Sequence, residues 1–411
     1  MSFETKIKKY ARLAIAAGVK IQPGQLLVIT ADVDCAWYVR ILVEEAYRSG
    51  AGEVVVNWND SQIDKLTYEY ADDAILSAYP QWRVNQRKEW IDRHCAFLSI
   101  GSPNPALLQD VDSSRIQRRQ KAASLAMKPF RYYTSASIGQ WSCELLPNVT
   151  WAKMVFPELS DQEAYDALFE AIFKCCRIDD EHDPIEAWEK HTATIVSRGE
   201  KLNAYQFKKL CFKNQLGTDI EVELVRPHRW GGGLEVTPEG VAFVPNLPTE
   251  EIFCIPRKDG VNGTVYASRP LNIQGKLVKD FWFRFEEGKV VDYGASENLT
   301  SLKNLLEMDE GAKHLGEVAL ISYDSPISQS NLIYYNGLID ENASCHMALG
   351  NCYPMNIPGG NQMSEKEMAD RGANFSMIHC DFMFGTSDLS VIGVQEDDSE
   401  VVLFKDGNFV I

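Results

Sequence analysis

Apolar residues in the first half of the chain follow helical and strand-like patterns in alternation. Between Ile7 and Gly18 they recur at helical spacing, and the short apolar run 26–31 follows a Pro-Gly turn. A second helical stretch over 34–50 leads into a second apolar run over 53–58. Helices that separate short buried strands are typical of a parallel or mixed sheet covered on both faces. The first half therefore predicts an α/β domain.

The pattern changes near residue 205. From there on, short β-like segments separated by turn residues dominate, with few helical stretches such as 299–309. A polar break that ends in proline, 179–184, lies between two helical stretches before this change. We expect an N-terminal α/β domain over 1–183 and a β-rich α+β catalytic domain over 184–411.

Charge and composition exclude several classes of function. The net charge is -17, with no basic stripe, which argues against nucleic acid and anionic membranes as partners. No apolar run is long enough for a membrane helix, and the N-terminus lacks the pattern of a signal peptide. The ten cysteines include no CxxC pair and indicate reduced thiols. We therefore expect a cytoplasmic protein.

Common catalytic and nucleotide-binding motifs are absent from the sequence. The first strand–helix junction, 29–37, contains neither a GxGxxG nor a GxxxxGK[ST] pattern. The chain also lacks GxSxG and HExxH. Candidate catalytic or metal-binding residues must therefore be sought one by one along the chain.

The histidines of the second half are the first candidates. On a strand through 376–385, the period of two places His379 and Asp381 on one face, among apolar neighbours. Such a pair requires either a metal ion or a buried hydrogen bond, and a core histidine oriented by Asp381 is the plain alternative. Four other histidines, which show no partner pattern, are interpreted as surface or incidental: His94, His182, His191 and His228.

Acidic residues near His346 extend the candidate set. Glu341 precedes His346 closely and Tyr353 follows it, although helix capping could explain the neighbouring polar residues. Glu317 enters an apolar strand, and Glu250 and Glu251 follow a proline-rich turn; each alone could be solvated. Together these segments supply the carboxylates and imidazoles that suit Zn, Co or Mn, and bridging carboxylates suit a pair of metals.

These same segments carry a resemblance to a known family. They read NLPTEEIF, HLGEVAL, DENASCHMALGNCY and NFSMIHCDFMFG, and the N-terminal half contains YARLAIAAGVKIQPGQ. In order and spacing they resemble the aminopeptidase T family of metallopeptidases, which includes aminopeptidase S and peptidase S. The resemblance covers essentially the whole chain.

The resemblance implies a dinuclear aminopeptidase that acts on peptides with a free N-terminus, and a homodimer. It implies Glu317 as the bridging carboxylate and Tyr353 as a phenol that steadies the intermediate. Glu250 is our candidate for the proton shuttle, a role that Glu251 could also fill. The implied metal ligands are Glu251, Glu317, Glu341, His346, His379 and Asp381.

Two other functions remain open from the residues alone. A two-metal deacylase, amidohydrolase or dipeptidase would use the same ligands, because ligands do not name a substrate. A non-catalytic scaffold that keeps the fold would bind no metal and turn over no peptide. Comparing free with N-acetylated peptides separates the aminopeptidase from the deacylase.

Overall fold

The computed structural model describes residues 1–273 and 276–411. The chain forms two compact units. The first, here called unit 1, consists of residues 1–190 and 234–247, and the second, unit 2, of residues 191–233 and 248–411. In the described part of the chain, no helix combines the length and apolar character that crossing a membrane requires.

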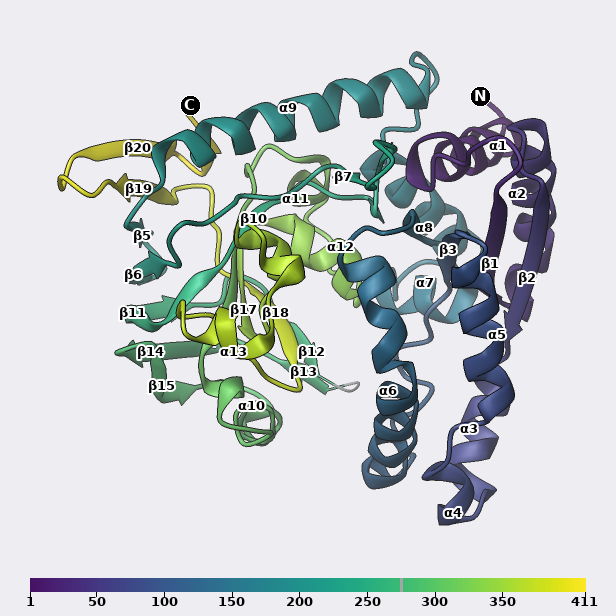
Figure 1. The fold of residues 1–411 in the computed structure, drawn as a ribbon, viewed down its shortest axis with the longest axis horizontal. Coiled ribbons are helices and arrows are strands. Elements are labelled where there is room, and N and C mark those ends of the chain that lie inside the picture. Colours follow the sequence, from purple (N-terminus) through teal and green to yellow (C-terminus); the bar gives the residue numbers. More distant parts are fainter. Residues whose placement is uncertain (274–275) are drawn as a thin grey trace. The chain divides into compact units, whose positions relative to one another are not determined.

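Unit 1 is built on a five-stranded sheet in the order β2-β1-β3-β4-β9 (Figure 1). All neighbouring strands in it are parallel, which confirms the predicted α/β region. The strands are β1 (Leu26–Asp32), β2 (Glu53–Asn59), β3 (Ala96–Gly101), β4 (Trp141–Leu145) and β9 (Asn246–Leu247). A separate hairpin pairs β7 (Glu235–Val236) with β8 (Ala242–Phe243).

Eight α-helices lie wholly within unit 1. They are α1 (Phe3–Leu13), α2 (Ala36–Arg48), α3 (Ser61–Tyr70), α4 (Asp73–Leu76), α5 (Gln81–Asp92), α6 (Ser113–Ser135), α7 (Val149–Val155) and α8 (Asp161–Cys175).

Local sequence explains where some of these helices begin and end. The buried face of α1 carries Ile7, Tyr10 and Ala11, the spacing that the sequence shows. Gly18 ends the π-helical turn Ala14–Gly18 that follows α1, and a Cβ there would lie 2.9 Å from the hydroxyl of Ser142. Helix α6 begins at Ser113, where the Asp112 side chain caps it by accepting from the backbone N–H of Ser114.

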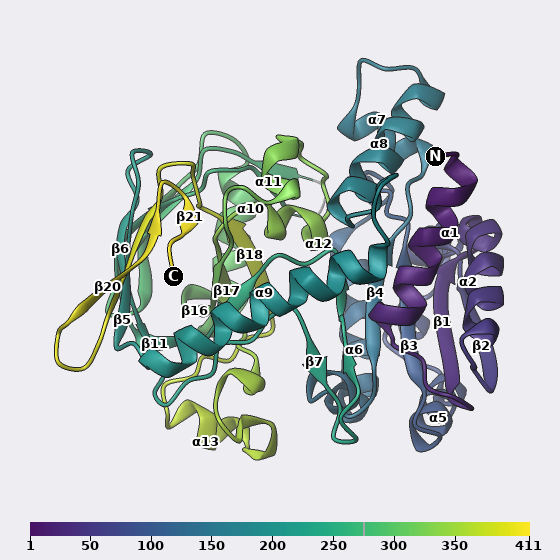
Figure 2. The ribbon, with the colours of Figure 1, turned by 90° about the horizontal axis from the view of Figure 1, so that it is seen from above.

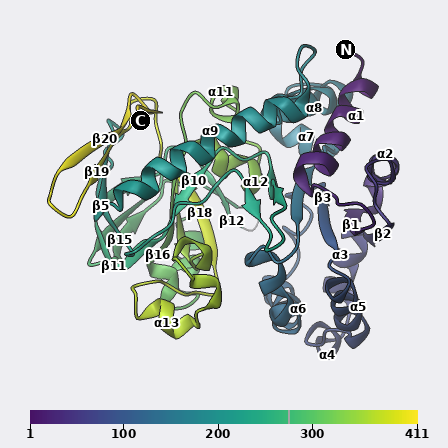
Figure 3. The same ribbon diagram turned by 45° about the horizontal axis from the view of Figure 1, so that its top comes forward.

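Unit 2 contains two larger antiparallel sheets and a small two-stranded one, seen in Figure 2 and from another side in Figure 3. The larger sheet has the order β15-β14-β11-β6-β5-β19-β20-β21, and the smaller has the order β10-β16-β17-β18. Residues buried between them, such as Phe212, Phe283, Val318 and Met347, belong to one apolar core. The antiparallel pairing of short strands agrees with the β-like segments and intervening turns expected after residue 205.

The strands of the larger sheet are β5 (Lys209–Lys213), β6 (Asp219–Leu224), β11 (Pro256–Tyr266), β14 (Trp282–Glu286), β15 (Lys289–Gly294), β19 (Ser390–Val394), β20 (Glu400–Lys405) and β21 (Asn408–Phe409). Those of the smaller are β10 (Ile252–Cys254), β16 (Leu315–Leu320), β17 (His346–Gly350) and β18 (His379–Met383). The two-stranded sheet pairs β12 (Leu271–Ile273) with β13 (Lys276–Val278). The helices of the C-terminal half are α9 (Pro184–Tyr205), α10 (Leu299–Leu306), α11 (Pro326–Ser330), α12 (Gly337–Asp340) and α13 (Glu365–Ala369).

Candidate metal centre

The four-stranded sheet of unit 2 carries most of the candidate residues on one face. Glu317 on β16 is paired with Ala348 on β17, which is paired with Asp381 on β18. His346 stands opposite Ala319, and His379 stands opposite Gly350. Paired residues in an antiparallel sheet share a face, so the two acids and two histidines point to the same side.

Small residues leave room above this face. Ala319, Ala348 and Gly350 occupy the paired positions between the acidic and imidazole side chains. Ala319 and Ala348 are fully buried. A sheet surface that alternates small residues with carboxylates and imidazoles is suited to hold ions above it rather than to pack against another layer of side chains.

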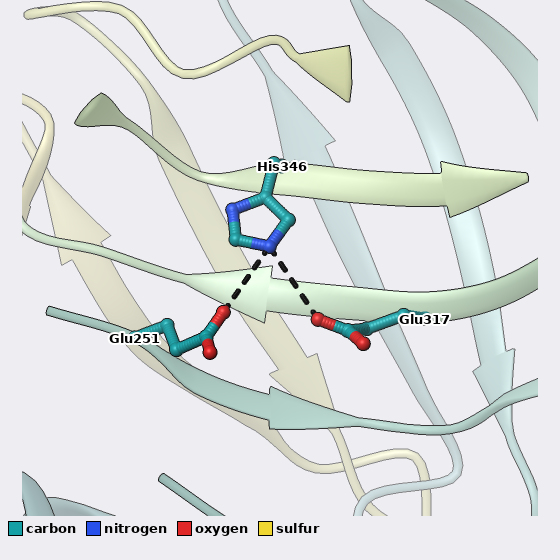
Figure 4. A group of neighbouring side chains, drawn as sticks. All are labelled: Glu251, Glu317 and His346. Atoms are coloured by element: carbon teal, nitrogen blue, oxygen red, sulfur yellow. Dashed lines mark ion pairs between the residues drawn. The ribbon is translucent and has the colours of Figure 1, made fainter. Parts of the chain in front are cut away.

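His346 is the centre of the first group of possible ligands. Its Nε2 atom lies 3.3 Å from Glu251 Oε2 and 3.4 Å from Glu317 Oε1 (Figure 4). Glu251 reaches this position from the residue before β10. Donor atoms of Glu251, Glu317 and His346 all lie within 4.8 Å of one another, the spacing of groups that could hold one ion.

His379 forms the second group with Glu317 and Asp381. Its Nε2 atom lies 3.6 Å from Glu317 Oε2 and 3.4 Å from Asp381 Oδ1. Glu317 therefore faces His346 with one carboxylate oxygen and His379 with the other. It is the only residue that belongs to both groups identified among the described residues.

Both histidines are oriented in the way that metal ligands are. Nδ1 of His379 lies 2.8 Å from the backbone oxygen of Asn351, and Nδ1 of His346 lies 3.4 Å from that of Ser344. A carbonyl oxygen only accepts, so Nδ1 carries a hydrogen and Nε2 is directed at the acids, where it would give its lone pair to a bound metal ion. Nε2 of His346 is buried and makes no hydrogen bond to any described residue. A buried nitrogen without a hydrogen-bond partner is suited to bind a divalent ion.

The electrostatics of the cluster lead to the same conclusion. Burial raises the pKa of Glu317, and burial together with the charges of Asp381 and Glu251 raises the pKa of Glu341 well above its ordinary value. Burial alone would lower the pKa of His379, but the charge of Asp381 outweighs it and raises that pKa to about 10. Crowded, buried carboxylates are costly without compensating cations, so the residues present fit bound metal ions.

The structure places the other predicted residues around these two groups. Glu341 is half-buried and interacts electrostatically with Asp381 and Glu251, but it is in neither three-residue group. The ring of Tyr353 lies 4.9 Å from that of His379, between centroids, and the residue is 39% exposed. The ring is thus beside the cluster, and burial raises the pKa of its phenol.

Glu250 lies in a different environment from Glu251. Its side chain is 7% exposed, and its Oε2 atom lies 3.6 Å from Nε2 of His191. Its backbone N–H donates to Asn342 Oδ1 at 2.8 Å, which ties it to the segment before His346. Glu251 faces His346. The two neighbouring acids therefore point to different partners.

Two of the histidines set aside from the sequence are placed differently than expected. His191 has a side chain that is only 12% exposed and lies beside Glu250, so it is not the surface residue that the sequence suggested. His228 is buried, and burial lowers its pKa to about 4. His94 and His182 are exposed, as expected. No spacing signal connects His191 with Glu250, because they are 59 residues apart.

A protein that combines a parallel sheet with antiparallel sheets and holds a buried carboxylate–imidazole cluster has the donor set of metal-dependent hydrolases. Comparison with known proteins identifies the family. Residues 3–409 match the family described as thermophilic metalloprotease (M29), and the chain belongs to that family of peptidases. The predicted resemblance is thereby confirmed, as is metal-dependent aminopeptidase function.

Several relatives match over their full length. Aminopeptidase 2 from Geobacillus stearothermophilus is 44% identical over 99% of this chain and 98% of its own. Aminopeptidase T from Thermus aquaticus is 38% identical over the whole of both chains. The solved structure of wild-type AmpT from Thermus thermophilus is 35% identical, covers both chains completely and gives a TM-score of 0.93.

Proposed function

We propose that the chain removes N-terminal residues from peptides at a centre of two divalent ions held in unit 2. The observation that carries this proposal is the placement of Glu317. Its two oxygens face two separate histidines, each oriented by a backbone carbonyl. A carboxylate placed between two imidazole-bearing groups is an arrangement that suits a pair of metals.

The proposed ligands divide into two sets that share Glu317. Glu251 and His346 belong with one ion, and His379 and Asp381 belong with the other. Glu341 is proposed as a further ligand because its charge acts on both Asp381 and Glu251. Charge supports two ions rather than one. Four carboxylates with two neutral imidazoles carry four negative charges, which two divalent cations balance.

The donor set favours Zn, Co or Mn. Carboxylate oxygens and imidazole nitrogens suit these metals, whereas thiolates would select softer ones. Cys380 lies between His379 and Asp381 on β18 and so points to the opposite face of the strand. When bound, such ions supply Lewis-acid polarisation of a scissile carbonyl and a water whose pKa is lowered.

The side chains around the ions would complete the chemistry. We assign Glu250 as the proton carrier to the leaving amine, because it is buried next to the cluster and faces His191 rather than a proposed ligand. Tyr353 would donate its phenolic hydrogen to the developing oxyanion from its place beside His379. A carboxylate of the cluster would hold the free α-amine of the substrate, which makes the enzyme an exopeptidase.

The cellular location, oligomeric state and domain bounds are proposed from the sequence and from its family resemblance. We propose a cytoplasmic homodimer with an N-terminal domain over 1–183, which falls in unit 1, and a catalytic domain over 184–411, which corresponds to unit 2 apart from residues 184–190 and 234–247. Aminopeptidase relatives support peptides with a free N-terminus as substrates. The strongly acidic net charge of -17 speaks against nucleic acid as a partner.

The test is an assay on leucine, arginine and alanine p-nitroanilides, after chelation and after return of Co²⁺, Zn²⁺ or Mn²⁺. We expect cleavage to disappear with chelator and to return with metal. His379→Asn should lose activity and metal. His94→Asn is the matched control, because His94 is exposed and its φ of 53° is one that asparagine tolerates.

A deacylase with the same ligands would give a different result. It would cleave N-acetylated peptides. An aminopeptidase leaves these intact, because it must bind the free α-amine. Folded, metal-loaded protein that cleaves the N-acetylated peptide and not the free one would replace our proposal with the deacylase.

A further inference from the structure

Unit 1 contains a cavity that has no part in the proposed metal chemistry. It has a volume of about 280 Å³ and lies between helices α5 and α6 and the strands β1 and β2. Figure 1 shows α5 and α6 side by side in this unit. This volume is close to the lower end of the range of small-molecule sites, roughly 300–1,000 Å³.

Three arginines line this cavity. Arg83 and Arg87 come from α5, and Arg131 comes from α6. Such convergence is unexpected in a chain with 58 acidic and 41 basic residues. Elsewhere in the same unit arginines pair with acids: Arg93 with Glu53 is one example.

No carboxylate balances the three guanidinium groups at close range. Among the described residues, no ion pair within 4.0 Å joins Arg83, Arg87 or Arg131 to an acid. Arg131 donates instead to the hydroxyl of Ser124. Burial raises the pKa of Asp64, and the charges of Arg119 and Arg83 partly offset this rise.

Arg87 is the most enclosed of the three. It is half-buried, and its guanidinium carbon lies 3.6 Å from the centre of the Phe97 ring. Burial lowers the pKa of Arg87, and the groups that partly offset this are the Cys95 thiol and the phenols of Tyr79 and Tyr133. A half-buried cation without a carboxylate is costly, and a bound anion would offset that cost.

The remaining walls supply hydrogen-bonding and apolar surfaces. Thr30 of β1 and Asn57 of β2 are directly paired in the parallel sheet, so their polar side chains stand together on one face. Both lie in the carboxyl-terminal halves of their strands, the end at which open α/β sheets bind ligands. Trp90 and Phe130 add aromatic surface.

We propose that this cavity is a binding site for a small organic oxyanion, a carboxylate or a phosphate, whose charged end is held by Arg83, Arg87 and Arg131. Arginine forks match the planar or tetrahedral oxygens of such anions. Thr30 and Asn57 complete the polar contacts, and the body of the ligand packs against Trp90. A polyanion such as nucleic acid is a poor fit, since the cavity is small and the whole chain is strongly acidic.

The experiment is a calorimetric titration of the full-length, metal-loaded protein with three probes. N-acetylphenylalanine offers a carboxylate and an aromatic body but no free amine. N-acetylphenylalaninamide is its neutral counterpart, and inorganic phosphate is the second oxyanion. We expect saturable binding of an oxyanion in the millimolar range or tighter, and none of the amide. The oxyanion that binds more tightly shows whether the site prefers a carboxylate or a phosphate.

Variants separate this site from the metal centre. The double variant Arg83→Gln with Arg131→Gln changes two exposed side chains and should weaken binding at least tenfold. Lys121→Gln, an exposed residue of α6 that does not line the cavity, removes one positive charge and should bind as the wild type does. The proposal is overturned if neither oxyanion binds, if acid and amide bind equally, or if the arginine variant keeps wild-type affinity.

Discussion

Ala348 offers a direct way to test that ions lie above the four-stranded sheet. Its side chain stands between those of Glu317 and Asp381 in the paired register of β16, β17 and β18. It is fully buried, so the methyl group fills its place without reaching solvent. Ala348→Leu adds three carbon atoms at the point where the carboxylates of both groups converge.

The expected losses of stability and activity follow from the space that the three added carbon atoms must occupy. Extra methylenes in a packed interior cost about 1–3 kcal/mol of stability. The functional loss should be larger, because a shift of reacting groups by about 1 Å can cost on the order of 100-fold in rate. We therefore expect a folded protein with less bound metal and activity reduced about 100-fold or more.

The assay combines metal content by mass spectrometry with turnover of leucine p-nitroanilide, on protein shown to be folded by circular dichroism. Met347→Leu is the matched control. Met347 neighbours Ala348 on β17 but points to the opposite face, into the apolar core, and the exchange conserves volume. Wild-type metal content and activity in Ala348→Leu would refute the placement of the ions on this face.

Three further predictions concern single side chains. Tyr353→Phe should lower kcat about 10²–10³-fold while metal content stays unchanged, because one oxyanion donor is lost; unchanged kcat in steady-state assays would remove Tyr353 from the mechanism. Glu250→Gln should lower kcat about 10²–10⁴-fold with full metal content, whereas Glu251→Gln should lower metal content itself; the reverse result in the same metal and rate measurements would exchange the two roles. Glu144 is fully buried with the Tyr38 hydroxyl donating to it at 2.7 Å, and burial raises its pKa well above the ordinary 4.5. Its protonated form therefore stabilises the fold fully below about pH 4.5, and this stability is lost as pH rises toward the folded-state pKa. Urea unfolding should show that Glu144→Gln loses less stability between acidic and neutral pH than the wild type does. Equal losses in the two proteins would contradict this.

Local patterns in the sequence were sufficient for part of the site. The period of two placed His379 and Asp381 on one face, and the structure has their Nε2 and Oδ1 atoms 3.4 Å apart. Short apolar runs likewise predicted β1 and β2 of the parallel sheet, although β2 lies at its edge and is only partly buried. Both inferences needed only residues close together in the chain.

Features that depend on distant pairing could not be predicted in this way. The register that aligns Glu317, Ala348 and Asp381 joins three strands, and nothing local specifies it. Residues 234–247 belong to unit 1 although they follow a segment of unit 2, and their strand β9 pairs with β4. His191 approaches Glu250 only through tertiary folding, which explains why it was interpreted as a surface residue.

The central claim is that Glu317 joins two ions in one centre. It is tested most directly by measuring metal per chain and activity together, while the chelated protein is titrated with Zn²⁺, Co²⁺ or Mn²⁺. We predict that binding saturates at two ions per chain, that peptide cleavage reaches its maximum there, and that Glu317→Gln lowers both. Full activity at one ion per chain, or wild-type metal content and activity in Glu317→Gln, would contradict the account.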